Sequence, residues 1–512
     1  MREEFTQFWF ECVLHEGEPN EEIKIEIDYN KLLAFLQEQG FGLLISGTER
    51  KTAEIVRVQA NIVSKTIEQH NSNITVKQFV LDFLARIKRF DVREIILRRQ
   101  GTFFSLNFLT AMRPLTLTFA RDTRTESVFC FQNGCLAIAA PSGGQVISTF
   151  QSYEARGVHV WDTQIQPRAY LGRHHPDHRD RAAADCEFAR FLTCVSQEWE
   201  AGELRADNLF AFVYALCYLL HTAKDIARAF AVLAVDNTVS DSTKGRRGKT
   251  IFALAVELFR KLTYEDGKTV RTDSVFMFQT IEADSQVVLF DDVRRDFDFE
   301  QFYPTITGPC MREQKGKGRV KTAFHDAPKF IFTSNRPILG DGDSDVARWF
   351  ILPFTAYFSL RHTPFDEFGH RLFDDWDDEE WARFFDWVAD SMARYLAYSN
   401  CPLYKKPEAD LTTYHAEKLK VIVASELVDY LDTYLNVLPY EIPKKLFFDD
   451  FKGLYPIYQE RTQHWFSAKL AAYCQVKGIL INPGCTENRL FITSLSSGER
   501  VEYLRFVAAK GA

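Results

Sequence analysis

The sequence has 512 residues, of which 46% are hydrophobic and 26% are charged, and its formal net charge is −8. A chain of this length exceeds what one hydrophobic core holds, so we expect about three domains. Its longest apolar run, 209–220, is too short to cross a bilayer and predicts a buried helix. Residues 1–4 carry no secretion-signal pattern, so we expect a cytoplasmic protein with no membrane partner. The negative charge excludes a surface that is basic throughout, and any contact with nucleic acid needs a local basic feature.

The cysteine pattern gives no sign of a metal centre. Ten cysteines are scattered along the chain, without a C-x-x-C pair or the cysteine–histidine spacing of a zinc site. We therefore expect buried thiols.

The pattern of apolar residues indicates four parts in chain order, and the fold class we expect is α/β. Residues 1–170 alternate between strand and helix patterns and predict an N-terminal α/β domain. Within it we expect strands at 8–14, 23–27, 128–131 and 135–139, and helices at 30–39 and 76–88. Residues 171–227 follow, which we expect to form a polar linker and then a segment that is helical over 187–227. We then expect an α/β domain at 228–395, which ends in a helical stretch at 365–389, and a further domain at 396–512.

The most informative segment is 243–250, which reads Thr-Lys-Gly-Arg-Arg-Gly-Lys-Thr. It follows an apolar strand pattern at 231–235 and opens a helix pattern at 251–262. A strand, a glycine-containing loop and a helix in this order place backbone N–H groups and a positive helix end around a polyphosphate. Lys249 is then expected to reach the β- and γ-phosphates of a nucleotide, and the Thr250 hydroxyl to contact Mg²⁺. The usual G-x-x-x-x-G-K-[ST] pattern has glycine where this chain has Thr243, and Gly245 and Gly248 complete the expected binding loop.

Two further strand patterns end in polar residues. The run 286–290 is apolar after its first residue and is followed by Asp291 and Asp292. At the carboxyl edge of a parallel sheet, Asp291 is expected to hold Mg²⁺ and Asp292 to orient or deprotonate an attacking water. The alternative is a pair of acids that cap the next helix. The run 329–334 ends at Asn335, whose amide suits a hydrogen bond to the γ-phosphate and to that water, although a turn also accounts for an asparagine there.

A basic segment lies between these two strands. Lys315, Lys317, Arg319 and Lys321 recur at a spacing of two, which places them on one face of an extended hairpin, and Gly316 and Gly318 permit a tight tip. A hairpin of this kind suits contact with the phosphate backbone of single-stranded nucleic acid. The alternative is an ordinary solvated hairpin.

The order of these four elements within 243–335 resembles that of the superfamily 3 helicases of viruses, phages and plasmids, which belong to the AAA+ class of ATPases. The resemblance is best over 187–358. It implies a P-loop ATPase core at 228–395 that binds ATP and Mg²⁺ and forms a ring, expected to be a hexamer, on single-stranded and forked duplex DNA. It also implies that 171–227 supports oligomerisation and that a separate primase or polymerase is a possible partner. A phage- or plasmid-encoded protein of this kind would act in the bacterial cytoplasm.

The same resemblance assigns roles residue by residue. Lys249, Asp291, Asp292 and Asn335 take the catalytic roles given above, and Arg348 is expected to act as an arginine finger on a neighbouring subunit's ATP. Arg336 and Arg361 are alternatives for that finger, and a surface salt bridge to Asp345 is the structural alternative for Arg348.

The flanking domains are assigned on weaker patterns. The N-terminal domain is expected to resemble a primase-associated domain without catalysis, because Glu26 and Asp28 lack a supporting Ser/His motif. Residues 396–512 resemble the winged-helix tail of these ATPases, with a packing module as the alternative. We therefore expect an ATP-dependent replicative DNA helicase. The alternative is an origin-binding initiator or loader that uses ATP as a switch and unwinds little.

Overall fold

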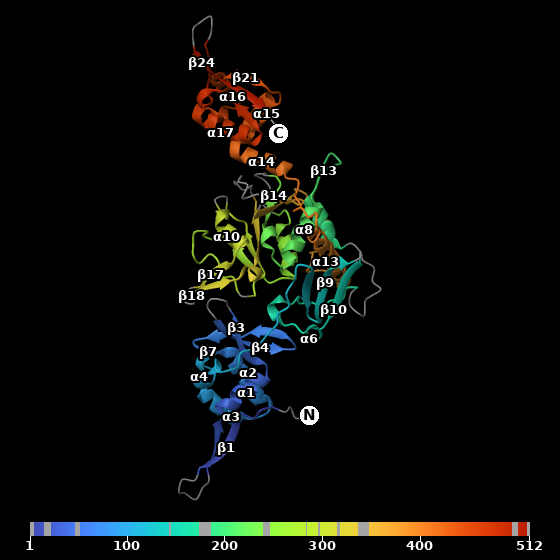
Figure 1. Ribbon diagram of the computed structural model, residues 1–512, viewed down its shortest axis with the longest axis vertical. Helices are drawn as coiled ribbons and strands as arrows, with labels where there is room; N and C mark the ends of the chain where they lie inside the picture. Colours follow the sequence, from blue (N-terminus) through green and yellow to red (C-terminus); the bar gives the residue numbers. More distant parts are fainter. Residues whose placement is uncertain are drawn as a thin grey trace.

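Three bodies lie in a row along the long axis of the computed structural model (Figure 1). The N-terminal unit lies at one end, an α/β body lies in the middle and the C-terminal unit lies at the other end. The structure describes residues 5–14, 22–46, 52–142, 145–173, 186–238, 246–282, 284–294, 297–314, 318–335, 348–493 and 500–508.

The N-terminal unit is an α/β structure with its own core. An antiparallel pair, β1–β2, precedes a sheet in the order β11-β5-β4-β3, and helices α1, α2 and α3 pack with it. Asp28 and Asn73 cap α1 and α2, because each side chain accepts a hydrogen bond from a backbone N–H of the first turn. The elements are β1 (Trp9–Leu14), β2 (Glu22–Ile27), α1 (Tyr29–Glu38), β3 (Phe41–Ser46), β4 (Thr52–Gln59), β5 (Ile62–Lys65), β6 (Glu68–Gln69), β7 (Ser72–Asn73), α2 (Ile74–Arg86), α3 (Phe90–Arg98), α4 (Gln100–Phe103), α5 (Leu106–Leu109) and β11 (Val160–Trp161).

The middle body contains a parallel five-stranded sheet in the order β15-β16-β19-β14-β20. Its strands are β14 (Ala231–Asp236), β15 (Leu262–Asp266), β16 (Val287–Asp291), β19 (Lys329–Ser334) and β20 (Trp349–Phe354). Both faces of the sheet are covered, because Val232 and Ala234 belong to one core and Leu233 and Val235 belong to another. This double burial explains why β14, β16 and β20 are nearly continuous apolar runs rather than alternating ones.

Helices on one face of the sheet share their core with a second sheet. Strands β8 (Glu126–Phe131), β9 (Gly134–Ser142) and β10 (Gln145–Gln151) form an antiparallel meander that packs against α13 (Asp378–Ser399). The other helices of this core are α7 (Glu187–Ser196), α8 (Leu209–Leu220) and α9 (Lys249–Glu257). Nine of the twelve residues of helix α8 are buried, as its apolar sequence predicts. Shorter helices are α6 (Tyr153–Arg156), α10 (Tyr303–Ile306) and α12 (Pro364–Phe368).

The expected continuous helix over 187–227 is wrong in its middle. Strands β12 (Gln197–Glu200) and β13 (Glu203–Asp207) form an antiparallel hairpin between α7 and α8. Ala201 and Gly202 form its tip with φ values of 52° and 86°. These left-handed conformations reverse the chain, and Gly202 adopts one at little cost because it has no Cβ.

A second hairpin and the C-terminal unit complete the fold. Strands β17 (Cys310–Gln314) and β18 (Gly318–Thr322) form the expected basic hairpin. In the C-terminal unit, helices pack on a small sheet in which β24 pairs with β21, β22 and β23. Its elements are α14 (Thr412–Val423), α15 (Ser425–Leu435), β21 (Tyr440–Pro443), α16 (Lys444–Leu454), α17 (Gln463–Val476), β22 (Ile479–Ile481), β23 (Leu490–Thr493) and β24 (Arg500–Ala508).

A buried ionic cluster fixes residues 122–128 against the middle body. Arg260 donates hydrogen bonds to Asp122 at 2.9 Å and to the carbonyl of Val128 at 3.0 Å. Burial opposes ionisation of Asp122, but Arg260 and backbone N–H donors hold its pKa below its ordinary value. Burial lowers the pKa of His221 to about 4, against the pull of Asp122, and its Nε2 lies 2.8 Å from the carbonyl of Thr123.

None of the described helices is both long and apolar enough to cross a membrane.

Candidate functional site

The candidate phosphate loop, 243–250, leads into the first turn of α9. Gly248 is the N-cap of this helix, with φ = 95°, and a Cβ at this position would lie 2.7 Å from the ring of Phe191. Conformation and space therefore both require glycine here. Backbone N–H groups of a first helical turn lack intrahelical acceptors, so this end of α9 suits an anion. Thr250 lies exposed in that turn, whereas Thr243 and Gly245 lie outside the described residues.

Lys249 lies at the centre of the site and is held by two side chains. Its Nζ donates to Oδ1 of Asp236 and, at 2.7 Å, to Oδ1 of Asn335. The Lys249 side chain is only 9% exposed, and burial lowers its pKa although Asp236 and Asp292 favour the charged form. The ammonium group is therefore fixed between the ends of β14 and β19.

Asn335 connects Lys249 to the acid pair. Its Nδ2 donates to Oδ1 of Asp292 at 2.8 Å, while its Oδ1 accepts from Lys249. The second carboxylate oxygen of Asp292 forms an ion pair with Lys268, which lies in the turn after β15. Because β19 lies between β14 and β16, the amide of Asn335 spans the gap between the lysine and the acid.

Thr333 fixes both acids of the pair. Its hydroxyl donates to Oδ1 of Asp291 at 2.6 Å and accepts from the backbone N–H of Asp292 at 2.7 Å. Asp292 has φ = 52°, a left-handed conformation that is uncommon for a non-glycine residue. The two side chains therefore leave the end of β16 with different hydrogen-bonding partners.

The two arginines of the loop take different positions. Arg246 is exposed, with φ = 68°. Arg247 is 2% exposed, and its Nη2 donates to Oγ1 of Thr238 at 3.2 Å. Burial lowers the pKa of Arg247, and this buried cation also disfavours the charged form of Lys249.

Two of the four basic residues expected to contact DNA lie outside the residues that the structure describes. Lys315 and Lys317 lie outside the described residues, as does Arg336. On the hairpin, Arg319 pairs with Glu313, and Lys321 pairs with Met311. Arg312 belongs to the opposite face, where it is buried and donates to the carbonyl of Ile281 at 2.7 Å. The alternation that separates inward and outward residues therefore places Arg319 and Lys321 together, as the sequence predicts.

Arg348 precedes β20 and is half-buried. Its guanidinium carbon lies 4.8 Å from the centre of the Tyr303 ring. Asp345, its alternative partner, lies outside the described residues. Arg361 is exposed beyond β20.

The residues present fit a nucleotide with a divalent cation. The fit rests on a fixed ammonium group, a helix N-terminus closed by an obligatory glycine, and a carboxylate, Asp291, at the end of the neighbouring strand. Within the described residues, groups of three or more histidine, cysteine, aspartate or glutamate side chains that could hold a metal alone are not found. A cation at this site would therefore need oxygen ligands from a phosphate or from water in addition to the protein.

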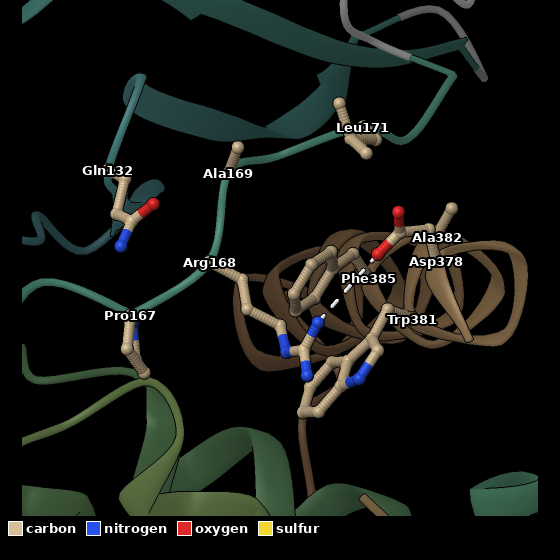
Figure 2. A pocket seen from close by; sticks show the side chains of 9 residues that line it. All are labelled: Gln132, Pro167, Arg168, Ala169, Leu171, Asp378, Trp381, Ala382 and Phe385. Atoms are coloured by element: carbon tan, nitrogen blue, oxygen red, sulfur yellow. Dashed lines mark ion pairs between the residues drawn. The ribbon is translucent and has the colours of Figure 1, made fainter. Parts of the chain in front are cut away.

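A hollow of about 320 Å³ lies apart from the Lys249 site, between residues 167–171 and helix α13 (Figure 2). The Arg168 guanidinium lies 4.5 Å from the centre of the Trp381 ring and 3.7 Å from Asp378. None of the described loop residues, 246–250, lines this hollow.

Three residues of the site were not identified from the sequence: Asp236, Lys268 and Thr333. The signal for Asp236 is an acid directly after the apolar run 231–235, and Thr333 precedes Asn335 by two positions. Lys268 follows Gly267, where a Cβ would lie 2.7 Å from the carbonyl oxygen of Asp291. The turn that carries Lys268 therefore approaches β16 more closely than a residue with a side chain at position 267 would allow.

The fold and the site define a mixed α/β protein whose parallel five-stranded sheet is consistent with a nucleotide-binding fold. No protein-family model matches the chain, and no curated protein gives a significant match. Among solved structures, the chain is similar to one described as the A form apo structure of the NrS-1 C-terminal region. The match has 14% identity and a TM-score of 0.39, and it covers 93% of this chain and 99% of that one. At this TM-score the similarity assigns no role to any residue.

Proposed function

We propose that this protein is an ATP-dependent DNA helicase of a phage, plasmid or other mobile element. It would have the P-loop AAA+ core of superfamily 3, and it would act as a ring on single-stranded DNA. The observation that carries the proposal is the hydrogen-bonded series Lys249–Asn335–Asp292 across the carboxyl ends of β14, β19 and β16. Ligands of open parallel sheets bind at this edge.

The roles of the individual residues follow from these contacts. Lys249 and the N-terminus of α9 bind the phosphates, and Asp292 orients the attacking water. Asn335 links Asp292 to Lys249. Mg²⁺, held by Thr250 and Asp291, would neutralise charge on the phosphates. Thr333 keeps Asp291 and Asp292 in place through its two hydrogen bonds.

The β17–β18 hairpin supports nucleic acid as the polymer on which the motor acts. Its outward face carries Arg319 and Lys321, and its inward face is anchored through Arg312. In a chain with a net charge of −8, a one-sided basic hairpin is a local site for a phosphate backbone. The C-terminal helices α15, α16 and α17 with the sheet around β24 are proposed to form the winged-helix-like unit.

The test is strand separation of a tailed DNA duplex by the full chain. Unwinding is expected with ATP and Mg²⁺ and not with a non-hydrolysable ATP analogue. ATP hydrolysis without strand separation, accompanied by tight binding of a particular duplex sequence, would favour the initiator or loader instead. A protein that neither binds nor hydrolyses ATP would end the proposal.

A further inference from the structure

Asp236 is a buried acid that belongs to none of the four motifs. It is the last residue of β14, it precedes the loop motif that starts at Thr243, and its side chain is 4% exposed. A carboxylate taken out of water is costly unless it is paired. Its partner is Lys249, the residue proposed to bind the phosphates.

The contacts of the neighbouring acids separate their roles from that of Asp236. Asp291 accepts from Thr333, and Asp292 accepts from Asn335 and pairs with Lys268. Among the described acids, Asp236 is the one whose carboxylate bonds Lys249 directly. Asp236 and Asn335 therefore hold the ammonium group from two adjacent strands, β14 and β19.

We propose that Asp236 is a positioning residue for Lys249, which it anchors at the strand end and holds back from the phosphates. This inference rests on the proposed ATPase function. The anchor has two opposing effects. It competes with bound phosphate for the same ammonium group, which weakens binding in the ground state. It also fixes the direction of Nζ, so that the charge developing during phosphoryl transfer meets an oriented cation.

The two effects predict that binding and turnover respond in opposite directions. Asp236→Asn keeps the shape of the side chain and its hydrogen-bonding oxygen but removes the charge. Affinity for a non-hydrolysable ATP analogue is expected to rise about threefold or more, while kcat falls about tenfold or more. Asp236→Glu restores a carboxylate and is expected to recover turnover relative to Asp236→Asn.

The matched control removes a lysine–aspartate pair elsewhere. Asp432 pairs with Lys477 at 2.8 Å in the C-terminal unit, and Asp432→Asn is expected to leave nucleotide affinity and kcat unchanged. The measurements are calorimetric binding of the analogue, steady-state ATP hydrolysis and the thermal unfolding midpoint of each variant.

Two results would overturn the inference. One is an Asp236→Asn variant whose kcat and affinity equal those of the wild type. The other is a joint loss of affinity and turnover with a lower unfolding midpoint, which would mean that Asp236 only supports the fold. Failure of the wild type to hydrolyse ATP would instead remove the proposed function, so the two failures are distinguishable.

Discussion

The side chains of Lys249 and Asn335 are hydrogen-bonded at 2.7 Å although 86 positions separate them in the sequence. The contact exists because β19 lies directly beside β14 and both strands end at the same edge of the sheet. Asn335 also donates to Asp292, so one amide connects the lysine proposed to bind phosphate with the residue proposed to orient water.

Asn335→Ala is expected to lower kcat for ATP by about 100-fold, because loss of one oriented polar group at a transition state has an effect of this size. Binding of an ATP analogue should change much less, since Lys249 and the N-terminus of α9 remain to bind the phosphates. Single-turnover hydrolysis and analogue binding measure the two effects. Asn400→Ala, at the end of α13, is the matched control. An equal loss of binding and turnover would contradict the proposed role.

Arg348→Ala is expected to leave ATP binding intact and to reduce hydrolysis by about 1,000-fold or more, as loss of an arginine finger does. If the finger acts in trans, mixing Arg348→Ala with Asp292→Asn protein should restore hydrolysis, because some interfaces then contain both intact groups. Titration of one variant into the other measures the restoration. Mixed protein that stays inactive would leave Arg348 as a packing partner of Tyr303.

Neutralising Arg319 and Lys321 together should weaken binding of single-stranded DNA and flatten its salt dependence. Two lost phosphate contacts correspond to a change of about 1.4 in the slope of log K against log salt concentration. Fluorescence anisotropy between low and moderate salt measures the slope. Glu313→Gln, on the paired strand, should act in the opposite direction. An unchanged slope would remove this face of the hairpin from the DNA path.

The cluster around Asp122 predicts lower stability in acid. The pKa of His221 is lowered to about 4 in the folded state, so the unfolded state binds more protons between pH 6.5 and 4. The contribution of His221 to the free energy of unfolding is therefore fully present above about pH 6.5. It is lost as the pH falls, by about 3 kcal/mol at pH 4. Asp122, whose pKa is also lowered, adds a loss in the same direction below its ordinary value.

Thermal unfolding midpoints of the wild type and His221→Gln across this range test the assignment. Glutamine can donate to the Thr123 carbonyl but does not titrate, so the variant should show a weaker dependence on pH. An identical dependence in both proteins would contradict it.

The sequence allowed three of the five strands of the central sheet to be predicted, because burial on both faces makes 231–235, 287–290 and 330–332 apolar runs, whereas β15 and β20 were not predicted. It did not allow their order to be predicted, since insertion of β19 between β14 and β16 depends on contacts between distant segments. Lys249, Asp292 and Asn335 were accordingly predicted as separate motif residues, whereas their hydrogen bonds to one another appear only in the structure.

The same limit explains the residues that sequence reasoning missed. Asp236 is the last residue of an otherwise apolar strand, and only its contact with Lys249 distinguishes it from a polar residue that simply ends a strand. The β12–β13 hairpin was missed because flanking apolar helices dominate the pattern at 187–227, although Gly202 marks its turn.

The most direct test of the central claim is ATP hydrolysis by the full chain with Mg²⁺, with and without single-stranded DNA, compared with that of Lys249→Ala. Lys31→Ala, in the first turn of α1, is the matched control for a lysine early in a helix. The proposal predicts hydrolysis that single-stranded DNA stimulates, that Lys31→Ala retains and that Lys249→Ala loses. Hydrolysis at the wild-type rate in Lys249→Ala would contradict it.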